Sequence, residues 1–457
     1  MSESGCTLFE TLSPDVPVAF WKGAYIYPEQ FQRHVFGIAE ALPDKKYAVN
    51  LCEDRYLFLV SFAACLLKSQ TSLLPPSCAE KEIERLLKLY DDAYCIVDNE
   101  TDADRPGQFA VQLGDIKKVV PSIYGFDRDV IAAIVFTSGS TGTPKPHQKC
   151  WKDLVTSSLK LKQALDLEKS GFDTIVATVP PQHMYGFEMS IIYPLVNRAC
   201  MHAGRPFFPL DMKNDIQDVA APRVLVTTPI HLRACNEADM VWPEIKAIVS
   251  AASELPEEVA RTAEIKMKSR VQEVYGCTEA GAIATRQTTR DKRWNLLEGY
   301  RVTNKTGSVW LSVPGIEDEI ELPDRVDTVD EKGFYLVGRN SDIVKIGGKR
   351  ASMASLVNTL RSIGGVEDGL MFNPEPVESK RQRLAAIVVA PGVSENEILL
   401  ELSKHIDQVF LPRQIIKVNH LPYSDTGKLT MDSICAIFNR RRSNDDQQVK
   451  AKCGYGG

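Results

Sequence analysis

Residues able to bind phosphate are concentrated in one short segment of the chain. Val130–Phe136 is an apolar run that predicts a buried strand, and it leads into a loop closed by Pro144. This loop offers hydroxyl groups, unhindered backbone N–H groups and one ammonium, from Thr137, Ser138, Gly139, Ser140, Thr141, Gly142 and Lys145. Many donors, little bulk and positive charge are what a polyphosphate requires. The spacing therefore predicts a phosphate-binding loop.

Two alternatives compete with this interpretation. A loop rich in glycine, serine and threonine that follows a strand is often no more than a turn. A nucleotide P-loop would need its lysine to open a helix, followed by serine or threonine. Lys145 instead lies between Pro144 and Pro146, so no helix begins there in the required way. The phosphate must be held by another geometry.

The elements that position this loop alternate between strands and helices. Residues 28–40 and 80–90 have the apolar spacing of amphipathic helices. Strands are predicted at residues 47–51, 93–97, 174–179, 224–228, 247–250 and 271–275. This alternation predicts an α/β fold with parallel-type sheets, in which ligands bind where the strands end.

The pattern changes in the last third of the chain. From about Lys305 short alternating strands predict a small β subdomain, and after Arg339 a compact α+β unit begins. We expect a large N-terminal domain over residues 1–340 and a smaller, mobile C-terminal domain over residues 341–443. Residues 444–457 are polar and are expected to form a disordered tail.

Composition narrows the class of protein. The 457 residues carry a net charge of −6 without a dominant basic run, so a nucleic-acid partner is not indicated. The 11 cysteines and 7 histidines show no zinc spacing, which favours reduced thiols in a cytoplasmic protein. No signal peptide is visible, and the longest apolar run, Leu57–Leu67, is about half the ~20 residues that cross a bilayer. We interpret that run as a core helix.

The segment Thr-Ser-Gly-Ser-Thr-Gly-Thr-Pro-Lys at 137–145 resembles the signature of the adenylate-forming superfamily. That superfamily includes acyl- and aryl-CoA synthetases, luciferases and the adenylation domains of peptide synthetases. Further segments resemble its motifs in the expected order over roughly residues 8–440, and the reduced length is similar to compact bacterial AMP-ligases of aryl-polyene-type pathways. The resemblance implies ATP, Mg²⁺ and either CoA or a phosphopantetheine carrier as the groups that the protein uses.

Two segments resemble the motifs that surround the adenine and the α-phosphate. Tyr275-Gly276-Cys277-Thr278-Glu279 resembles Tyr-Gly-x-Thr-Glu, which implies that Tyr275 and Gly276 lie at adenine, that Thr278 donates to the α-phosphate and that Glu279 binds Mg²⁺. Residues 250–255 resemble, more loosely, a turn lying against adenine, here with Ala252 and Ser253. A plain strand–helix junction with Ser253 as N-cap is the alternative.

The C-terminal motifs imply contacts to ribose and carboxylate. Asp327 resembles the aspartate that binds the ribose hydroxyls, with Asp324 and Asp330 as competitors, and Arg339 would act as a fixed cation beside ribose or phosphate. The hinge of the family falls at Ser341, where aspartate or lysine is more common.

Two lysines of the C-terminal domain are assigned by the same resemblance. Lys428 ends a Pro-x-x-x-x-Gly-Lys segment and would neutralise the carboxylate and the α-phosphate during adenylation. Lys345 lies on the face that serves thioester formation. In the family the C-terminal domain rotates between the two half-reactions, so each lysine serves one of them.

The substrate acid is expected beside His183, Tyr185 and Gly186, because Pro180–Gly186 resembles the acyl-pocket segment of acyl-CoA synthetases. Phe187-Glu188 is not the Phe-Asp pair with which peptide synthetases bind an α-amino group. A small carboxylic acid without an α-amine is therefore favoured. The expected reaction is ATP-dependent formation of acyl- or aryl-AMP, followed by transfer to a thiol. Adenylation alone, a non-catalytic nucleotide-binding relative and a kinase-like phosphotransferase are the alternatives.

Overall fold

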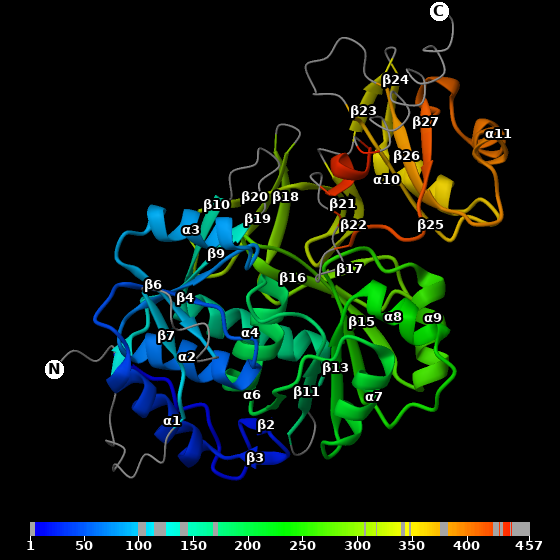
Figure 1. Cartoon of the computed structure of the whole chain (residues 1–457). Helices are drawn as coiled ribbons and strands as arrows, with labels where there is room; N and C mark the ends of the chain where they lie inside the picture. Colours follow the sequence, from blue (N-terminus) through cyan, green and yellow to red (C-terminus); the bar gives the residue numbers. More distant parts are fainter. Residues whose placement is uncertain are drawn as a thin grey trace, which may run out of the picture. The chain divides into compact units, whose positions relative to one another are not determined.

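The structure is a computed structural model, and its chain folds into two compact units that are described separately (Figure 1). It describes residues 5–98, 107–113, 125–137, 145–167, 172–305, 308–316, 318–339, 343–346, 349–374, 383–423, 429, 433–438 and 440. The first unit consists of Met1–Thr303, Trp310–Ile320 and Thr328–Phe334, and the second consists of Asn304–Val309, Glu321–Asp327 and Tyr335–Gly457.

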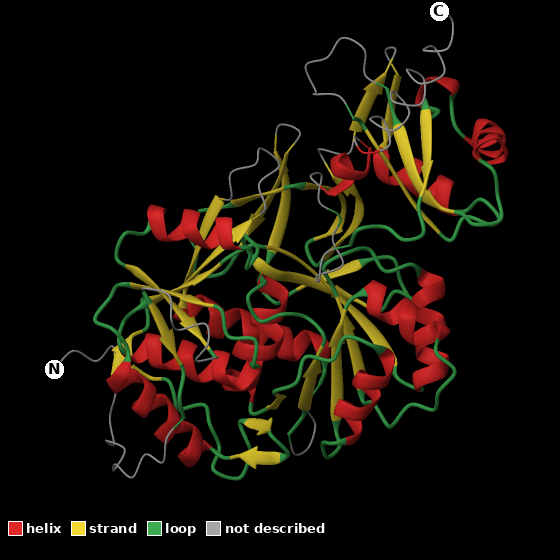
Figure 2. Cartoon of the chain, viewed as in Figure 1, coloured by secondary structure: helices red, strands yellow, loops and turns green. Residues whose placement is uncertain are grey.

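The larger sheet of the first unit is parallel at its centre and antiparallel at its edges (Figure 2). Within this unit its strand order is β17-β16-β15-β14-β13-β11-β12-β2-β3. Their bounds are β2 Ala19–Trp21, β3 Ala24–Ile26, β11 Thr174–Ala177, β12 Cys200–His202, β13 Arg223–Thr227, β14 Ala247–Ser250, β15 Arg270–Cys277, β16 Gly281–Arg286 and β17 Trp294–Leu296. The predicted parallel core is confirmed, and the antiparallel edges are an addition that strand–helix alternation did not predict.

A second sheet in the same unit has the order β10-β9-β5-β4-β6-β7. Its strands are β4 Tyr47–Asn50, β5 Thr71–Leu74, β6 Ala93–Val97, β7 Gln108–Ala110, β9 Ile131–Thr137 and β10 Lys145–Cys150. Strands β9 and β10 pair antiparallel, with Lys145 opposite Thr137. A short pair of β1 Gly5–Thr7 and β8 Gly125–Asp127 completes the strands before residue 150.

Helices cover these sheets because each presents an apolar face or is apolar throughout. Helix α1, Pro28–Ala41, buries Phe31, Val35 and Ile38 on one side. Helix α2, Arg55–Leu67, is almost entirely buried, and Asp54 caps it by accepting from the backbone N–H groups of Tyr56 and Leu57. The other helices of this unit are α3 Glu80–Leu89, α4 Trp151–Leu165, α5 Met184–Phe187, the π-helix η2 Glu188–Ile192, α6 Tyr193–Asn197, α7 Pro209–Gln217, α8 Pro229–Glu237 and α9 Glu257–Met267.

The last third of the chain contains smaller sheets. Strands β18 Arg301–Lys305, β19 Ser308–Ser312 and β20 Ile320–Leu322 form one, in the region predicted as a small β subdomain. They are followed by β21 Asp324–Asp330 and β22 Gly333–Arg339. The second unit also has the hairpin of β23 Ile343–Ile346 with β24 Lys349–Ser352, and the sheet of β25 Asp368–Phe372, β26 Ala385–Val389 and β27 Gln414–Lys417.

The second unit has its own apolar core, which packs helices α10 Met353–Arg361 and α11 Glu395–His405 with its strands. Leu360, Val388 and Leu402 are fully buried there. Helix α11 begins with a capping box between Ser394 and Glu397. Among the helices that the structure describes, none combines the length and the apolar composition needed to cross a membrane.

Candidate active site

The predicted phosphate loop connects two antiparallel strands of the smaller sheet. Thr137 is the last residue of β9 and Lys145 the first of β10, and they lie opposite each other. Ser138, Gly139, Ser140, Thr141 and Gly142 fall outside the described residues. No helix follows the lysine at once, as the flanking prolines predicted, so this arrangement is not that of a P-loop.

One face of β10 carries three basic or titratable side chains in alternation: Lys145, His147 and Lys149. Lys145 is exposed, His147 is half-buried and Lys149 is buried. Burial lowers the pKa of both His147 and Lys149. The sequence analysis assigned a role only to Lys145.

The Tyr275–Glu279 motif lies at the tip of a β-hairpin. Strand β15 runs through Cys277 and turns at residues 278–280 into the antiparallel β16, so the motif does not simply follow a parallel strand. The register shifts between Tyr275 and Gly276, and a Cβ at Gly276 would overlap the backbone oxygen of Gly281. Such a bulge redirects the side chains that follow it. Thr278 and Glu279 are both partly exposed on this tip.

Tyr275, predicted to lie at adenine, is 8% exposed. Its ring contacts the ring of Trp294 at 5.5 Å between centroids and that of Phe334 at 5.5 Å. These contacts fix the orientation of the ring at the base of the hairpin.

The hairpin tip and strand β10 are in direct contact, although about 130 residues separate them in sequence. The Nζ of Lys149 donates to the backbone oxygen of Glu279 at 2.6 Å. The Nε2 of His147 lies 3.7 Å from Oε1 of the same glutamate. The structure thus brings the strand that leaves the predicted phosphate loop against the residue predicted to bind Mg²⁺. His147 and Lys149 of β10 thus lie against Glu279, and Lys145 begins the same strand.

The predicted acyl-side segment follows β11 and contains the short helix α5. His183 is the N-cap of α5, and the hydroxyl of Tyr185 donates to the backbone oxygen of Val249 at 2.8 Å. Gly186 is buried, and a Cβ there would overlap the carbonyl oxygen of Pro180. The absence of a side chain at Gly186 lets α5 approach the end of β11 closely.

Glu188 follows this segment in the π-helix η2 and was not among the predicted site residues. Its Oε1 accepts from the backbone N–H of Ala282 at 3.2 Å and from the hydroxyl of Ser157 at 3.5 Å. Burial raises the pKa of its carboxyl to about 7. The signal that could have found it is a glutamate within an apolar run, Phe187–Ile192, because a charge at such a position needs partners.

Arg55 was also missed. Its guanidinium is fully buried and donates to the backbone oxygens of Ala177, at 2.8 Å, and Val179, at 3.0 Å, and to the hydroxyl of Ser190. Burial lowers the pKa of Arg55 to about 9. The arginine therefore anchors the start of α2 to the end of β11, just before the acyl-side segment.

The turn after β14 was predicted as either an adenine contact or a helix N-cap at Ser253. The N-cap alternative is wrong, because α9 begins at Glu257 with Pro256 as its N-cap. Ser253 is exposed, and Ala252 has φ +76°. A left-handed conformation is costly for alanine, and such strain is typically kept where a site requires it.

The remaining predicted residues belong to the second unit. Asp327 is exposed on β21, whereas its competitor Asp330 is bound by Arg293 at 2.7 Å and Asp324 is buried. Arg339 ends β22 and Lys345 lies in β23. Lys428 and Ser341 fall outside the described residues.

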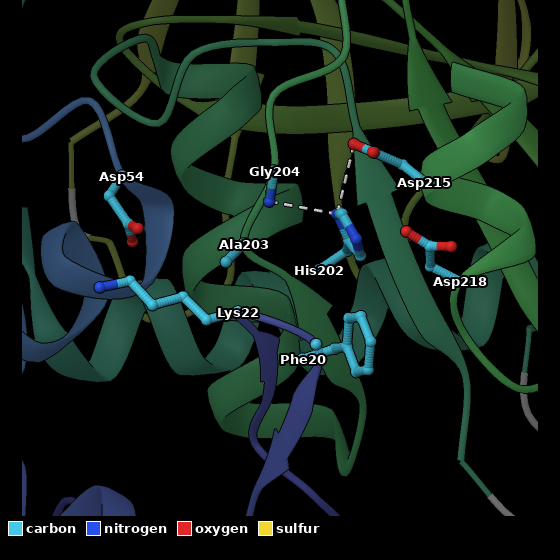
Figure 3. Close-up of a pocket in the computed structure, with 9 residues that line it drawn as sticks. Phe20, Lys22, Asp54, His202, Ala203, Gly204, Asp215 and Asp218 are labelled. Atoms are coloured by element: carbon cyan, nitrogen blue, oxygen red, sulfur yellow. Dashed lines mark hydrogen bonds and ion pairs between the residues drawn. The ribbon is translucent and has the colours of Figure 1, made fainter. Parts of the chain in front are cut away.

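A cavity of about 310 Å³ lies elsewhere in the first unit (Figure 3). Its wall includes His202, whose Nδ1 lies 3.5 Å from the carboxylate of Asp215 and accepts from the backbone N–H of Gly204 at 3.1 Å. Burial lowers the pKa of His202 to about 4 and raises that of Asp215 to about 6. None of its nine lining residues was predicted from the sequence. We therefore do not place the substrate there.

Comparison with known proteins identifies the family. The profile described as "AMP-binding enzyme" matches residues 43–323, more than half of the chain. The chain belongs to the AMP-binding enzymes. The adenylate-forming superfamily predicted from the sequence is thereby confirmed.

Relatives of this AMP-binding enzyme include ligases for aromatic acids. It is 26% identical over 302 residues to a 4-coumarate–CoA ligase of Cereibacter sphaeroides, covering 64% of this chain and 69% of that protein. It is 20% identical over 350 residues to a 3,4-dihydroxybenzoate–[aryl-carrier protein] ligase of Bacillus anthracis, with 72% and 82% covered. Among solved structures, ATP-bound MatB of Rhodopseudomonas palustris superposes with a TM-score of 0.80 at 17% identity, covering 94% and 97%. The last likeness confirms the predicted α/β fold.

Proposed function

We propose that this AMP-binding enzyme is an acid–thiol ligase that forms an acyl-adenylate. A carboxylate attacks the α-phosphate of ATP, the bond to the β-phosphate breaks, and acyl-AMP and pyrophosphate result. A thiol then attacks the acyl carbon and displaces AMP. The family and the relatives that are named ligases support this proposal. Its cytoplasmic location stays a prediction.

The observation that carries the proposal is the contact between β10 and the Thr278–Glu279 tip. The half-buried His147 lies 3.7 Å from the partly exposed Glu279, Lys149 donates to the backbone oxygen of Glu279, and the exposed Lys145 begins the strand that carries both basic residues. A cation and a carboxylate at one place allow one side to bind phosphate and the other a hard metal ion. Bringing two anions together is the main barrier, so positioning and charge neutralisation by the protein supply most of the rate.

The residues at this tip fit a magnesium ion that arrives with the nucleotide. The side chain of Glu279 is 34% exposed, and the imidazole of His147 lies 3.7 Å from its carboxylate. No cluster of three or more metal-ligating side chains occurs in the described part of the chain, so a metal here would take most of its ligands from phosphate oxygens and water. Bound there, Mg²⁺ would neutralise phosphate charge.

Specific roles for the second unit are part of the proposal. Lys428 is assigned to adenylation and Lys345 to thioester formation, with rotation of the domain at 341–443 about Ser341 between the two steps. Asp327 and Arg339 are assigned to the ribose and phosphate side. Asp327 is favoured over Asp330 because the latter is held by Arg293.

The acid is proposed to lack an α-amine and to bind beside His183 and Tyr185. The names of several relatives refer to aromatic acids, such as coumarate, dihydroxybenzoate and succinylbenzoate, and another refers to a long-chain fatty acid. The acceptor is CoA or the phosphopantetheine arm of a carrier protein, the two acceptors that appear in those names.

The test is acid-dependent exchange of labelled pyrophosphate into ATP, measured across a panel of aromatic and aliphatic acids. Exchange that requires an acid, with AMP as the product, supports the proposal. ATP binding without exchange for any acid would indicate a non-catalytic relative. ADP as the product would indicate a phosphotransferase. Adding CoA or a carrier protein then shows whether the reaction proceeds to a thioester or stops at adenylation.

Replacing the two lysines separates the half-reactions. We expect Lys428→Ala to slow pyrophosphate exchange at least about 10²-fold, the typical loss of one such donor, while thioester formation from supplied acyl-AMP continues. Lys345→Ala should do the reverse. An equal fall of both rates in either variant would contradict the assignment of one lysine to each step.

A further inference from the structure

Two buried, oppositely charged side chains hold the hairpin tip from two different elements. Lys149 lies on β10, which leaves the predicted phosphate loop, and Glu188 lies in η2, just after the predicted acyl-side segment. Their exposed fractions are 7% and 8%. Charged side chains are rarely buried unless they have a specific partner. The partner of each is the backbone at or beside the turn that carries Thr278 and Glu279.

The contacts on the two sides of the turn are complementary. The Nζ of Lys149 donates to the carbonyl oxygen of Glu279 at 2.6 Å, and Oε1 of Glu188 accepts from the N–H of Ala282 at 3.2 Å. The ammonium of Lys149 thus holds an acceptor of the turn, and a carboxyl oxygen of Glu188 holds a donor. Hydrogen bonds to charged groups are stronger than neutral ones, and more so in a buried environment.

Steric packing places Glu188 directly under the turn. Gly281 has φ +77°, and a Cβ at this position would overlap Oε1 of Glu188 and lie 3.3 Å from the terminal carbon of Met184. The glycine therefore allows both the conformation of the turn and the close approach of the carboxylate. The turn cannot move towards η2 without meeting this side chain.

We propose that Lys149 and Glu188 are positioning residues that fix the Cys277–Ala282 turn so that Thr278 and Glu279 meet the nucleotide in the geometry that adenylation requires. This inference rests on the proposed function for its catalytic readout. It assigns to this lysine and this glutamate a role that acts through the backbone of the turn. Because a displacement of about 1 Å can cost about 10²-fold in rate, a backbone hydrogen bond under the turn can control turnover.

A purely structural ion pair is the competing explanation, and the chain supplies a matched control for it. Lys246 and Asp173 form a partly buried ion pair at 2.7 Å in the same unit. Each residue directly precedes a strand of the larger sheet, so this pair lies at the amino ends of β14 and β11. It is far along those strands from the ends where ligands bind in such sheets.

The experiment compares Lys149→Met with Lys246→Met in the full-length protein, each measured by pyrophosphate exchange, by melting temperature and by hydrogen exchange of peptides that cover residues 277–282. We expect Lys149→Met to lower kcat of the exchange at least about tenfold with less than about threefold change in the KM for ATP. Amides of the turn should exchange faster. Lys246→Met should lower the melting temperature without either effect.

A double variant separates positioning from stability. Lys149→Met alone leaves the buried carboxyl of Glu188 without the nearby ammonium, so Lys149→Met/Glu188→Met should regain part of the melting temperature lost by Lys149→Met. The exchange rate should stay at least about tenfold low, because neither backbone group of the turn is held. Recovery of the rate together with the melting temperature would overturn the inference.

The inference can still be tested if Lys149→Met does not fold, and also if the proposed function is wrong. If Lys149→Met does not fold, Glu188→Gln replaces it. Because the amide can still accept from Ala282 but carries no charge, the turn should exchange faster and kcat should fall by a smaller factor. If the unmodified protein shows no acid-dependent exchange, the proposed function fails, and the protection of residues 277–282 in the variants still decides the inference. Unchanged protection in both variants would contradict it.

Discussion

Two lysines of the first unit are held in different ways. Lys246, before β14, donates directly to the carboxylate of Asp173, so the two charges neutralise each other at the amino ends of the strands. Lys149 donates instead to a backbone oxygen, and the nearby carboxylate of Glu188 accepts from a backbone N–H. The first arrangement joins two strands. In the second arrangement Lys149 and Glu188 both bind the backbone at or beside one turn. This indicates that their role is to hold that turn in position.

The same contrast extends to the hydrogen bonds around these regions. At the amino ends Arg270 donates to the backbone oxygens of Leu165 and Asp166, and Arg223 to that of Val219. At the carboxyl ends, the hydroxyls of Thr178 and Thr228 each bond to Nδ1 of His231, and the hydroxyl of Ser250 is buried without a partner among the described residues. Buried hydroxyls without a partner among the described residues also occur at the amino ends, at Thr174 and Ser269, so the side-chain network around His231 is what distinguishes the carboxyl ends. Four changes test this contrast, from the largest expected effect to the smallest.

Glu279→Gln should have the largest effect. Removing the charge at the hairpin tip should lower acid-dependent pyrophosphate exchange by about 10²-fold or more, because the carboxylate is the proposed metal ligand. The melting temperature should change little, since this side chain is 34% exposed. Exchange at varied Mg²⁺ concentration measures the effect. If the variant and the unmodified protein exchange pyrophosphate at the same rate at every Mg²⁺ concentration, the proposed role of Glu279 as a metal ligand is contradicted.

Gly281→Ala should affect both rate and stability. The added Cβ would overlap Oε1 of Glu188 at a positive φ, so we expect a loss of about 1 to 3 kcal/mol in the free energy of unfolding and about a tenfold lower exchange rate. Chemical denaturation and exchange kinetics are the measurements. Gly315→Ala is the control for the cost of a positive φ without a steric overlap, because the φ of Gly315 is +88° and a Cβ there would meet nothing within 4 Å.

His231→Gln tests the buried polar network at the carboxyl ends through pH. Burial lowers the pKa of His231 to about 4, whereas the unfolded chain titrates near 6.5. Below pH 6.5 the unfolded chain binds a proton that the folded chain does not, so this histidine makes stability rise with pH between about 4 and 6.5. The dependence should be weaker in the variant by on the order of 1 to 2 kcal/mol across that window. Identical pH profiles of the melting temperature would contradict this.

Ala252→Gly should have the smallest effect. Relief of the left-handed conformation favours glycine, and the greater freedom of glycine in the unfolded chain opposes it. The free energy of unfolding should therefore change by less than about 1 kcal/mol. A loss of exchange activity larger than about tenfold would show that the methyl group itself contacts the nucleotide. The KM for ATP reports this directly.

Much of the architecture could be predicted from the sequence because single strands and helices carry their own pattern. The run at 130–136, the helix at 57–67 and the strand at 93–97 have the right type and nearly the right bounds. The prolines around Lys145 excluded a helix there, and the structure has a strand. These features depend on neighbouring residues only.

What could not be predicted depends on pairing between distant segments. The hairpin that carries Thr278 arises because β16 pairs back on β15, and β10 reaches it from another sheet. In the sequence Arg55 is simply an arginine that follows an N-cap. Its role depends on its hydrogen bonds to the backbone oxygens of Ala177 and Val179, which are distant in sequence. Ser253 had the right chemistry for an N-cap, but Pro256 directs the start of the helix. Local propensity yields to such contacts.

The π-helix η2 makes the length of its segment as important as its composition. Its wider turn lies between Tyr185, which reaches the backbone of Val249, and α6, while Glu188 reaches Ala282 from its first position. A π-turn accommodates one extra residue with little net rotation of the helix on either side. The segment can therefore present Tyr185 to Val249 and Glu188 to Ala282 while α6 keeps its own buried face. Deleting one residue within 188–192 should restore regular helix and displace the side chains inside the turn rather than those of α6.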